Sequence, residues 1–95
     1  MLEITAFRLV AGADEEAFLA ADGRVQCEFA YRQPGLMRRT TARGADGAWI
    51  VIELWRADAD ADVAAGPRHH DEATGVFLSF VDPTTVRTGR YTTLD

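Results

Sequence analysis

The sequence predicts an α+β fold of the ferredoxin-like type, β-α-β-β-α-β, in which a four-stranded antiparallel sheet carries its helices on one face. Three observations predict it. Residues 36–56 have the composition of two strands joined by a turn, which is a β-hairpin. Segments with the apolar spacing of helices precede and follow this hairpin. A further strand-like segment stands near each end, and no linker or repeat interrupts the order, so we expect one domain, residues 1–95.

The hairpin is the most informative stretch because its second strand and its turn are both well marked. Residues 48–55 contain three consecutive β-branched residues between two tryptophans, so we expect this strand to be central in the sheet and buried on both faces. If Gly44–Gly47 forms a four-residue loop, Arg38 faces Glu53 on the neighbouring strand. A two-residue loop sets Thr40 opposite Glu53 and leaves the same residues on each face of the sheet.

A strand and a helix are predicted before the hairpin, and a last strand is predicted at the C-terminal end. A first strand is predicted over Leu2–Val10, where apolar residues alternate, and a last one over Val86–Leu94, which is rich in threonine. Asp14 is the predicted N-cap of a helix that extends to about Arg32. The apolar stripe of this helix, which we expect to face the sheet, consists of Phe18, Ala21, Val25 and Phe29.

The second helical segment is predicted in two pieces. Asp58 or Asp60 would cap a short helix through Ala65, which Gly66-Pro67 breaks because proline has no backbone N–H to donate. A second helical piece covers Arg68–Phe80. The residues of this piece that share one face are Ala73, Val76, Phe77 and Phe80.

The overall composition argues against several classes of protein. A net charge of −5 works against nucleic-acid binding, and no apolar run approaches the roughly 18 residues of a membrane span. The first residues lack the basic and apolar regions of a signal peptide, and the single cysteine, Cys27, allows no internal disulfide. We therefore expect a cytoplasmic protein without membrane or nucleic-acid partners, in which Cys27 is buried and inert.

Charge is distributed unevenly between the predicted elements. All ten basic residues are arginines, and seven of them fall on predicted strands, whereas most acidic residues fall on predicted helices and the segments that lead into them. This pattern predicts ion pairs between neighbouring strands and between the sheet and the helices. The alternative is that some of the arginines bind an anionic or phenolate-like ligand.

Four segments together are typical of a known family. They are a Gln-Pro-Gly after the first helix, a tryptophan-rich strand that leads into an acidic helix start, a Val-Asp-Pro after a phenylalanine-rich helix, and a last strand: residues 33–35, 49–58, 81–83 and 91–94. In these segments, and over nearly its whole length, the chain resembles the dimeric α+β barrel proteins of the antibiotic biosynthesis monooxygenase type. The resemblance implies a homodimer with sheets packed face to face. It also implies a pocket between helices and sheet in each protomer for a small aromatic or polyketide-like molecule, with no cofactor.

A homodimer is also expected from the residues themselves. The predicted central strand carries apolar residues on both faces, while both helices cover only one face of the sheet. The second face must therefore be covered, and a second copy of the chain is the partner we expect.

The sequence departs from this family in the residues that carry its chemistry. The quinone-forming and the heme-degrading members both use an asparagine as a key polar group, and this chain contains no asparagine. Heme-degrading members also place a tryptophan in the helical segment some nine residues after the tryptophan that ends the third strand. Counting in this way from Trp55 gives Ala64, so heme degradation is not expected.

His69 and His70, followed by Asp71 and Glu72, are the one concentrated set of proton-transfer or metal-ligand residues in the chain. His69 and Glu72 are three residues apart and can share a helix face, but two ligands do not make a metal site. Three interpretations are open: a solvated helix start, proton transfer by one histidine, or a metal site completed from elsewhere. The first is favoured, and no metal is assigned.

Glu53 is the second candidate because it lies in the middle of the most apolar strand, where a carboxylate must be paired or protonated. Its predicted partners are Arg38, Arg56 or Arg90, and this structural pairing competes with a role as a base in a ligand pocket. Arg38 is also a candidate ligand-binding residue. The aromatic candidates for lining a pocket, which at these spacings are more typical of a core, are Trp49, Trp55, Phe77, Phe80 and Tyr91.

These observations are consistent with three functions. The first is binding of a small aromatic or polyketide-like compound with cofactor-free oxidation, in which His69 or His70 acts as the base and an arginine holds the phenolate. The second is a non-catalytic small-molecule-binding or accessory protein with the same fold. The third is a cyclase or isomerase in which a histidine or Glu53 only moves protons.

Overall fold

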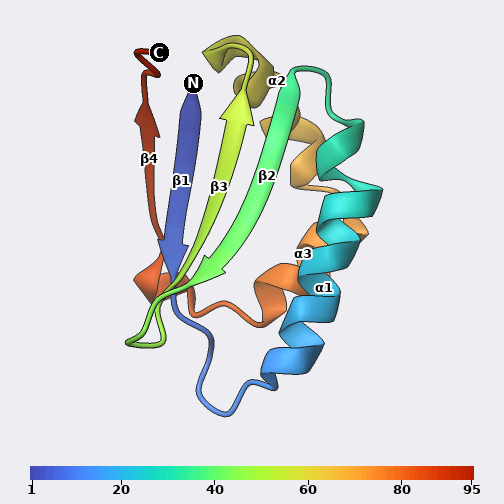
Figure 1. The fold of residues 1–95 in the computed structure, drawn as a ribbon. Coiled ribbons are helices and arrows are strands. Elements are labelled where there is room, and N and C mark those ends of the chain that lie inside the picture. The colour runs from blue at the N-terminus through green and yellow to red at the C-terminus, as the bar shows by residue number, and fades with distance from the viewer.

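A computed structural model describes all 95 residues and shows a four-stranded sheet with every helix packed on the same face (Figure 1). The strands are antiparallel and lie in the order β2-β3-β1-β4. This is the ferredoxin-like arrangement, so the predicted fold class is confirmed. The elements are β1 (Leu2–Phe7), α1 (Glu15–Glu28), β2 (Leu36–Arg43), β3 (Trp49–Trp55), α2 (Asp58–Arg68), α3 (Glu72–Ser79) and β4 (Arg87–Tyr91).

The hairpin of β2 and β3 has a different register from the one predicted. Arg39 lies opposite Glu53, so the prediction that Arg38 or Thr40 faces this carboxylate was wrong by one residue. Because side chains alternate along a strand, a shift of one residue exchanges the two faces of β2. Arg39 therefore points toward the helices and Arg38 is exposed.

The cause of the shift is the length of the hairpin loop. The backbone N–H of Gly44 donates to the carbonyl of Ala48, and the N–H of Gly47 donates to the carbonyl of Gly44, which leaves a loop of three residues. Gly47 has a φ of +84°, in the left-handed region that glycine adopts without strain. Such three-residue loops, a turn followed by a left-handed glycine, are a common hairpin type, whereas the predicted loops had two or four residues.

Strand β3 is central, as predicted, but its two faces differ in burial. The side facing the helices is buried along the whole strand and consists of Trp49, Val51, Glu53 and Trp55. The opposite side is only partly buried and is formed by Ile50, Ile52 and Leu54. Within one chain, therefore, burial on both faces is incomplete, and the partly buried side is apolar.

The apolar side chains form two separate clusters. The larger one centres on Phe18 of α1, whose ring lies 5.0 Å from that of Trp49 and 5.3 Å from that of Phe77. The smaller one consists of Trp55 with Ala61 and Ala64 of α2. The sheet-facing stripe predicted for α1 is buried in full, because its spacing places all four members on one side of the helix.

The helix boundaries differ from the predictions in four places, one of which is that α3 covers only Glu72–Ser79 and not Arg68–Phe80. Asp14 caps α1 as predicted, but the helix ends at Glu28, and only a short 3₁₀ turn continues to Arg32. Gly66-Pro67 does not break α2, which ends at Arg68; a proline in the last turn removes only one helical hydrogen bond. The N-cap of α2 is Ala57, so neither Asp58 nor Asp60 caps it.

Smaller predictions also need correction. Cys27 is exposed on α1, not buried, and Val76 is exposed on α3 while Thr74 takes a buried place. Strand β1 ends at Phe7 and β4 at Tyr91, each three residues short of the predicted C-terminal end. None of these differences changes the strand order.

Candidate functional site

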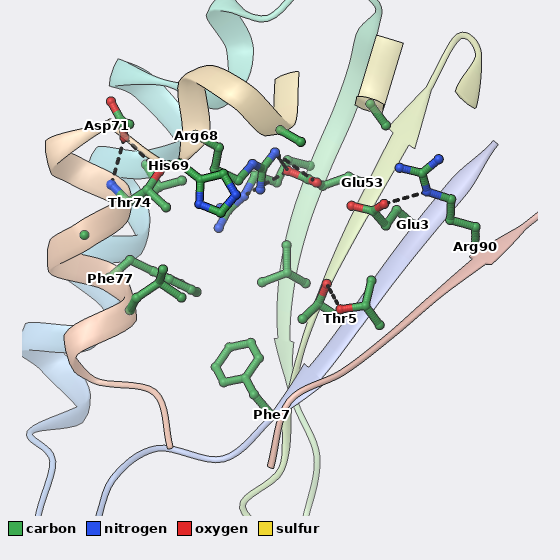
Figure 2. A pocket seen from close by; sticks show the side chains of 18 residues that line it. Glu3, Thr5, Phe7, Glu53, Arg68, His69, Asp71, Thr74, Phe77 and Arg90 are labelled. Atoms are coloured by element: carbon green, nitrogen blue, oxygen red, sulfur yellow. Dashed lines mark hydrogen bonds and ion pairs between the residues drawn. The ribbon is translucent and has the colours of Figure 1, made fainter. Parts of the chain in front are cut away.

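A cavity of about 380 Å³ lies between the helix-facing side of the sheet and helices α2 and α3. Its volume falls at the lower end of the range for small-molecule sites. Figure 2 shows that apolar and charged side chains occupy different parts of it. The apolar part is formed by Phe7, Val25, Val51 and Phe77.

The charged part follows from the register of the sheet. Antiparallel pairing places four charged residues, one from each strand, beside one another on the helix-facing side, in the order Arg39, Glu53, Glu3 and Arg90. Directly opposed like charges destabilise a sheet, so Glu53 and Glu3 need counter-charges. Each has an arginine on its outer side, so the four formal charges of the row sum to zero.

Glu53 is the most buried carboxylate of the cavity, and two arginines neutralise it. Its side chain is 4 % exposed, and Arg68 Nη2 at the end of α2 lies 3.3 and 3.2 Å from its two oxygens. Arg39 Nε approaches the same carboxylate at 3.8 Å, and Arg39 Nη2 donates to Asp22 Oδ1 at 2.8 Å. Buried charges persist only when paired in this way.

Arg39 is held by several further groups. Thr41 donates its hydroxyl to the same Asp22 oxygen at 2.8 Å, and the backbone N–H of Arg39 donates to the hydroxyl of Tyr31 at 2.9 Å. The guanidinium lies 5.8 Å from the centre of the Phe77 ring. Its Nε–H is buried without an acceptor, so one donor of this cluster remains unsatisfied.

The second ion pair of the row closes the opposite side of the cavity. Arg90 Nε donates to Glu3 Oε2 at 2.9 Å, and Arg90 Nη2 lies 2.8 Å from Asp62 Oδ1 of α2. The hydrogen bond to Glu3, followed by the one to Asp62, raises the pKa of Arg90 above its ordinary value. Two residues further along β1 than Glu3, the hydroxyl of Thr5 lies 3.3 Å from that of Thr88 on β4.

His69 is the one histidine of the cavity wall. It lies in the turn between α2 and α3, and its side chain, which has no hydrogen-bond partner, projects toward the sheet beside Arg68 (Figure 2). Both histidines are exposed, but His70 does not line the cavity. Asp71, which also lines the cavity, is the N-cap of α3 and accepts from the backbone N–H and the hydroxyl of Thr74, both at 2.8 Å. The structure therefore distinguishes His69, which lines the cavity, from His70, which does not. The sequence alone could not distinguish them.

The other residues named from the sequence are spread over the molecule. Glu53 and Phe77 line the cavity with His69, whereas Trp49, Trp55 and Phe80 do not. The tryptophans belong to the two apolar clusters, and Phe80 packs against the larger one. Tyr91 is 56 % exposed on the edge strand β4, and Arg38 is exposed.

Four charged residues of the site were missed from the sequence: Glu3, Asp22, Arg39 and Arg68. Asp22 could have been found, because it falls on the buried stripe of α1 between Ala21 and Val25, where an acidic residue needs a partner. Arg39 could not, because its orientation depends on the loop length. Arg68 reaches Glu53 only through the path of α2 across the sheet.

No three His, Cys, Asp or Glu side chains are grouped so that they could hold a metal ion. The helices are also too short or too polar for any of them to cross a membrane.

The sheet order, the helices on one face and a cavity between the two layers together define the fold class. The protein has the α+β fold of antibiotic biosynthesis monooxygenase-like domains, as the sequence resemblance implied.

Solved structures with this fold include oxygenases. SnoaB from Streptomyces nogalater, described as a cofactor-independent oxygenase, superimposes with a TM-score of 0.80 at 19% identity, over 99% of this chain and 92% of its own. Two provisionally named antibiotic biosynthesis monooxygenases also match. The Bordetella bronchiseptica protein has a TM-score of 0.76 at 16% identity, over 97% of this chain and 96% of its own. The Nitrosomonas europaea protein has a TM-score of 0.71 at 20% identity, over 98% of this chain and 88% of its own. No protein-family model and no curated protein matches the sequence.

Proposed function

We propose that the protein binds a small aromatic molecule with an acidic hydroxyl group in the cavity and oxidises it with molecular oxygen, without a cofactor. The observation that carries the proposal is the position of His69 beside Arg68 at the charged end of a cavity whose other end is apolar. An aromatic body would contact Phe7 and Phe77, and its oxygen would lie near the base and the cation. The likeness to SnoaB supports this chemistry but, at 19% identity, does not carry it.

The residues suggest a division of labour. His69 would accept a proton from the substrate, which leaves an electron-rich enolate or phenolate. Arg68 would stabilise the negative oxygen through its Nε and Nη1 groups, which make no hydrogen bond within the protein, while Nη2 remains on Glu53. Oxygen would then add to the activated carbon. For a CH₂ group converted to C=O, one oxygen atom enters the product and the other leaves as water.

Glu53 is not assigned as the base. Its carboxylate is covered by Arg68 and paired with Arg39, so a substrate in the cavity would meet the arginine before the carboxylate. We infer a structural and positioning role for Glu53, which fixes the orientation of the Arg68 guanidinium.

The test uses 1,8-dihydroxyanthrone, an acidic tricyclic compound with an oxidisable CH₂ group, as the probe. We expect saturable oxygen uptake in an oxygen-electrode assay, above the uncatalysed rate, with one oxygen molecule consumed for each quinone formed. Binding measured by fluorescence titration without added oxygen uptake would instead identify a non-catalytic binding protein. Conversion of a probe without oxygen consumption would identify the proton-transfer cyclase or isomerase.

We further propose that the working form is a homodimer. The side of the sheet away from the helices presents Ile50, Ile52 and Leu54 of β3 beside Leu2 and Ile4 of β1, all only partly buried in one chain. A second copy packed on this face would complete their burial.

A further inference from the structure

Helix α2 is attached to the rest of the protein by less apolar surface than α1 or α3. Only Ala61 and Ala64 of its eleven residues are buried, whereas α1 buries Phe18 and Val25 and α3 buries Phe77. The two alanines pack on Trp55 in the smaller cluster, which is separate from the larger one. A displacement of α2 would therefore disturb the smaller cluster and leave the larger one intact.

Two ion pairs connect α2 to the sheet instead. Asp62 Oδ1 lies 2.8 Å from Arg90 Nη2 of β4, and Arg68 Nη2 lies 3.2 Å from Glu53 Oε2 of β3. The Asp62 side chain is 65 % exposed and that of Arg68 is 32 % exposed, so solvent and salt reach both pairs. In Figure 2 the partners on the sheet, Glu53 and Arg90, project from the strands on the sheet side of the cavity.

The two ends of α2 are held differently. At its N-terminal end, Gly35 packs so closely on Asp60 that a Cβ at position 35 would lie 2.3 Å from the Asp60 carboxyl carbon. At its C-terminal end, the last turn of α2 contains Gly66-Pro67, and in the turn that follows, the N–H groups of His69 and His70 bond only to the carbonyls three residues before them. The C-terminal end, which carries the cavity-lining residues, is thus held mainly by Arg68.

We propose that α2 and the His69–His70 turn form a movable wall of the cavity, which the Asp62–Arg90 and Glu53–Arg68 ion pairs hold closed. The wall pivots at the close contact between Gly35 and Asp60. Opening uncovers Trp55 and Glu53 and enlarges a cavity that is small in its closed form, so that bulkier ligands are admitted. This motion is independent of the reaction that takes place in the cavity.

Hydrogen–deuterium exchange of the full-length protein tests the motion directly. In Asp62→Asn and in Arg90→Met, amides of the C-terminal half of α2 should exchange about two- to fivefold faster, the factor that the loss of an exposed ion pair supports. Amides of α1 and α3 should keep their rates. Sodium chloride at about 1 M, where the Debye length falls to ~3 Å, should accelerate amide exchange in α2 of the wild type more than in α2 of Asp62→Asn.

The matched control is Asp46→Asn, which breaks the Arg8–Asp46 pair, a somewhat more exposed ion pair that lies at the β2–β3 loop. It should leave α2 exchange unchanged. A second readout uses Trp49→Phe, which leaves Trp55 as the one tryptophan of the chain. Acrylamide quenching of Trp55 fluorescence should increase on adding Asp62→Asn to this background.

Either of two results would overturn the proposal. One is that α2 exchanges no faster in Asp62→Asn and Arg90→Met than in the wild type, with Trp55 equally protected from acrylamide in both. The other is that α1, α2 and α3 accelerate together, because that pattern reports global destabilisation and not the movement of one wall.

Discussion

Arg68 donates from a single nitrogen, Nη2, to both carboxylate oxygens of Glu53, at 3.3 and 3.2 Å, and thereby covers the most buried carboxylate of the cavity. The contact joins the last turn of α2 to the middle of the central strand. It leaves the remaining N–H groups of Arg68 free beside His69. The same pair thus serves the packing of the fold and the chemistry proposed for the cavity.

Replacing Arg39 should destabilise the protein strongly. Arg39→Met would leave the buried carboxylates of Asp22 and Glu53 without their shared cation, and breaking a buried ion pair in this way costs about 3–5 kcal/mol. Urea unfolding followed by circular dichroism measures the loss. Arg38→Met is the matched control, since Arg38 is exposed on the neighbouring position, and its effect should stay within about 0.5 kcal/mol. Equal effects from the two substitutions would contradict the observed register of β2.

Replacing Glu53 should cost stability, but less than replacing Arg39. In Glu53→Gln, Arg39 keeps Asp22 and Arg68 turns to solvent, so we expect a loss of about 1–3 kcal/mol. In the double variant with Arg68→Met, the two losses should be less than additive, because the residues are in direct contact. A double-mutant cycle from unfolding curves gives this coupling. An unchanged melting curve in Glu53→Gln, together with loss of probe turnover, would show that Glu53 acts as a base after all.

The two histidines should differ in their effect on activity. His69→Ala removes the one histidine that lines the cavity and should lower the rate of 1,8-dihydroxyanthrone oxidation by about 10²- to 10⁴-fold, the usual contribution of a general base. His70→Ala, at an exposed neighbouring position, should retain the wild-type rate. Initial rates of oxygen uptake compare the two, with thermal melts to confirm folding. Full activity in His69→Ala would remove histidine from the mechanism.

The protein should be a dimer that depends on the outer face of the sheet. Light scattering at micromolar concentration should give about twice the chain mass of 10.4 kDa. Ile52→Glu places a charge at the centre of the apolar face and should shift the mass to that of a monomer. Val63→Glu, on the exposed side of α2, should leave the dimer intact. A wild-type mass near that of one chain would refute the assembly.

The hairpin loop should contribute a small, pH-dependent part of the stability. The backbone N–H of Ala48, and secondarily the charge of Arg8, hold the pKa of Asp46 below its ordinary value. Because the folded-state pKa is the lower one, the contribution is fully present above the unfolded value of about 3.9 and is lost as pH falls through the folded value. Asp46→Asn should therefore lower stability at pH 6 and converge with the wild type in strong acid, as unfolding curves at each pH would show. A difference that grows as the pH falls would contradict the assignment.

The sequence alone determined the element order, the central place of β3 and the buried stripe of α1, because these depend on local periodicity and on turn residues. It also pointed to Glu53 as a carboxylate that must be paired. The arginines that pair with Glu53 could not be predicted from the local sequence pattern. The hairpin loop is one residue shorter than the four-residue loop that pairs Arg38 with Glu53, and this difference exchanged the faces of β2 and replaced Arg38 by Arg39.

Only the tertiary structure decided which residues surround the cavity. The row of charges across four strands depends on three strand registers at once, and Arg68 reaches it because α2 continues through Gly66-Pro67 before the chain turns. In the same turn, His69 lines the cavity and His70 does not, although both are exposed. Adjacent residues with identical chemistry differ in their surroundings only through the direction of their side chains, which the backbone path sets and the sequence pattern does not.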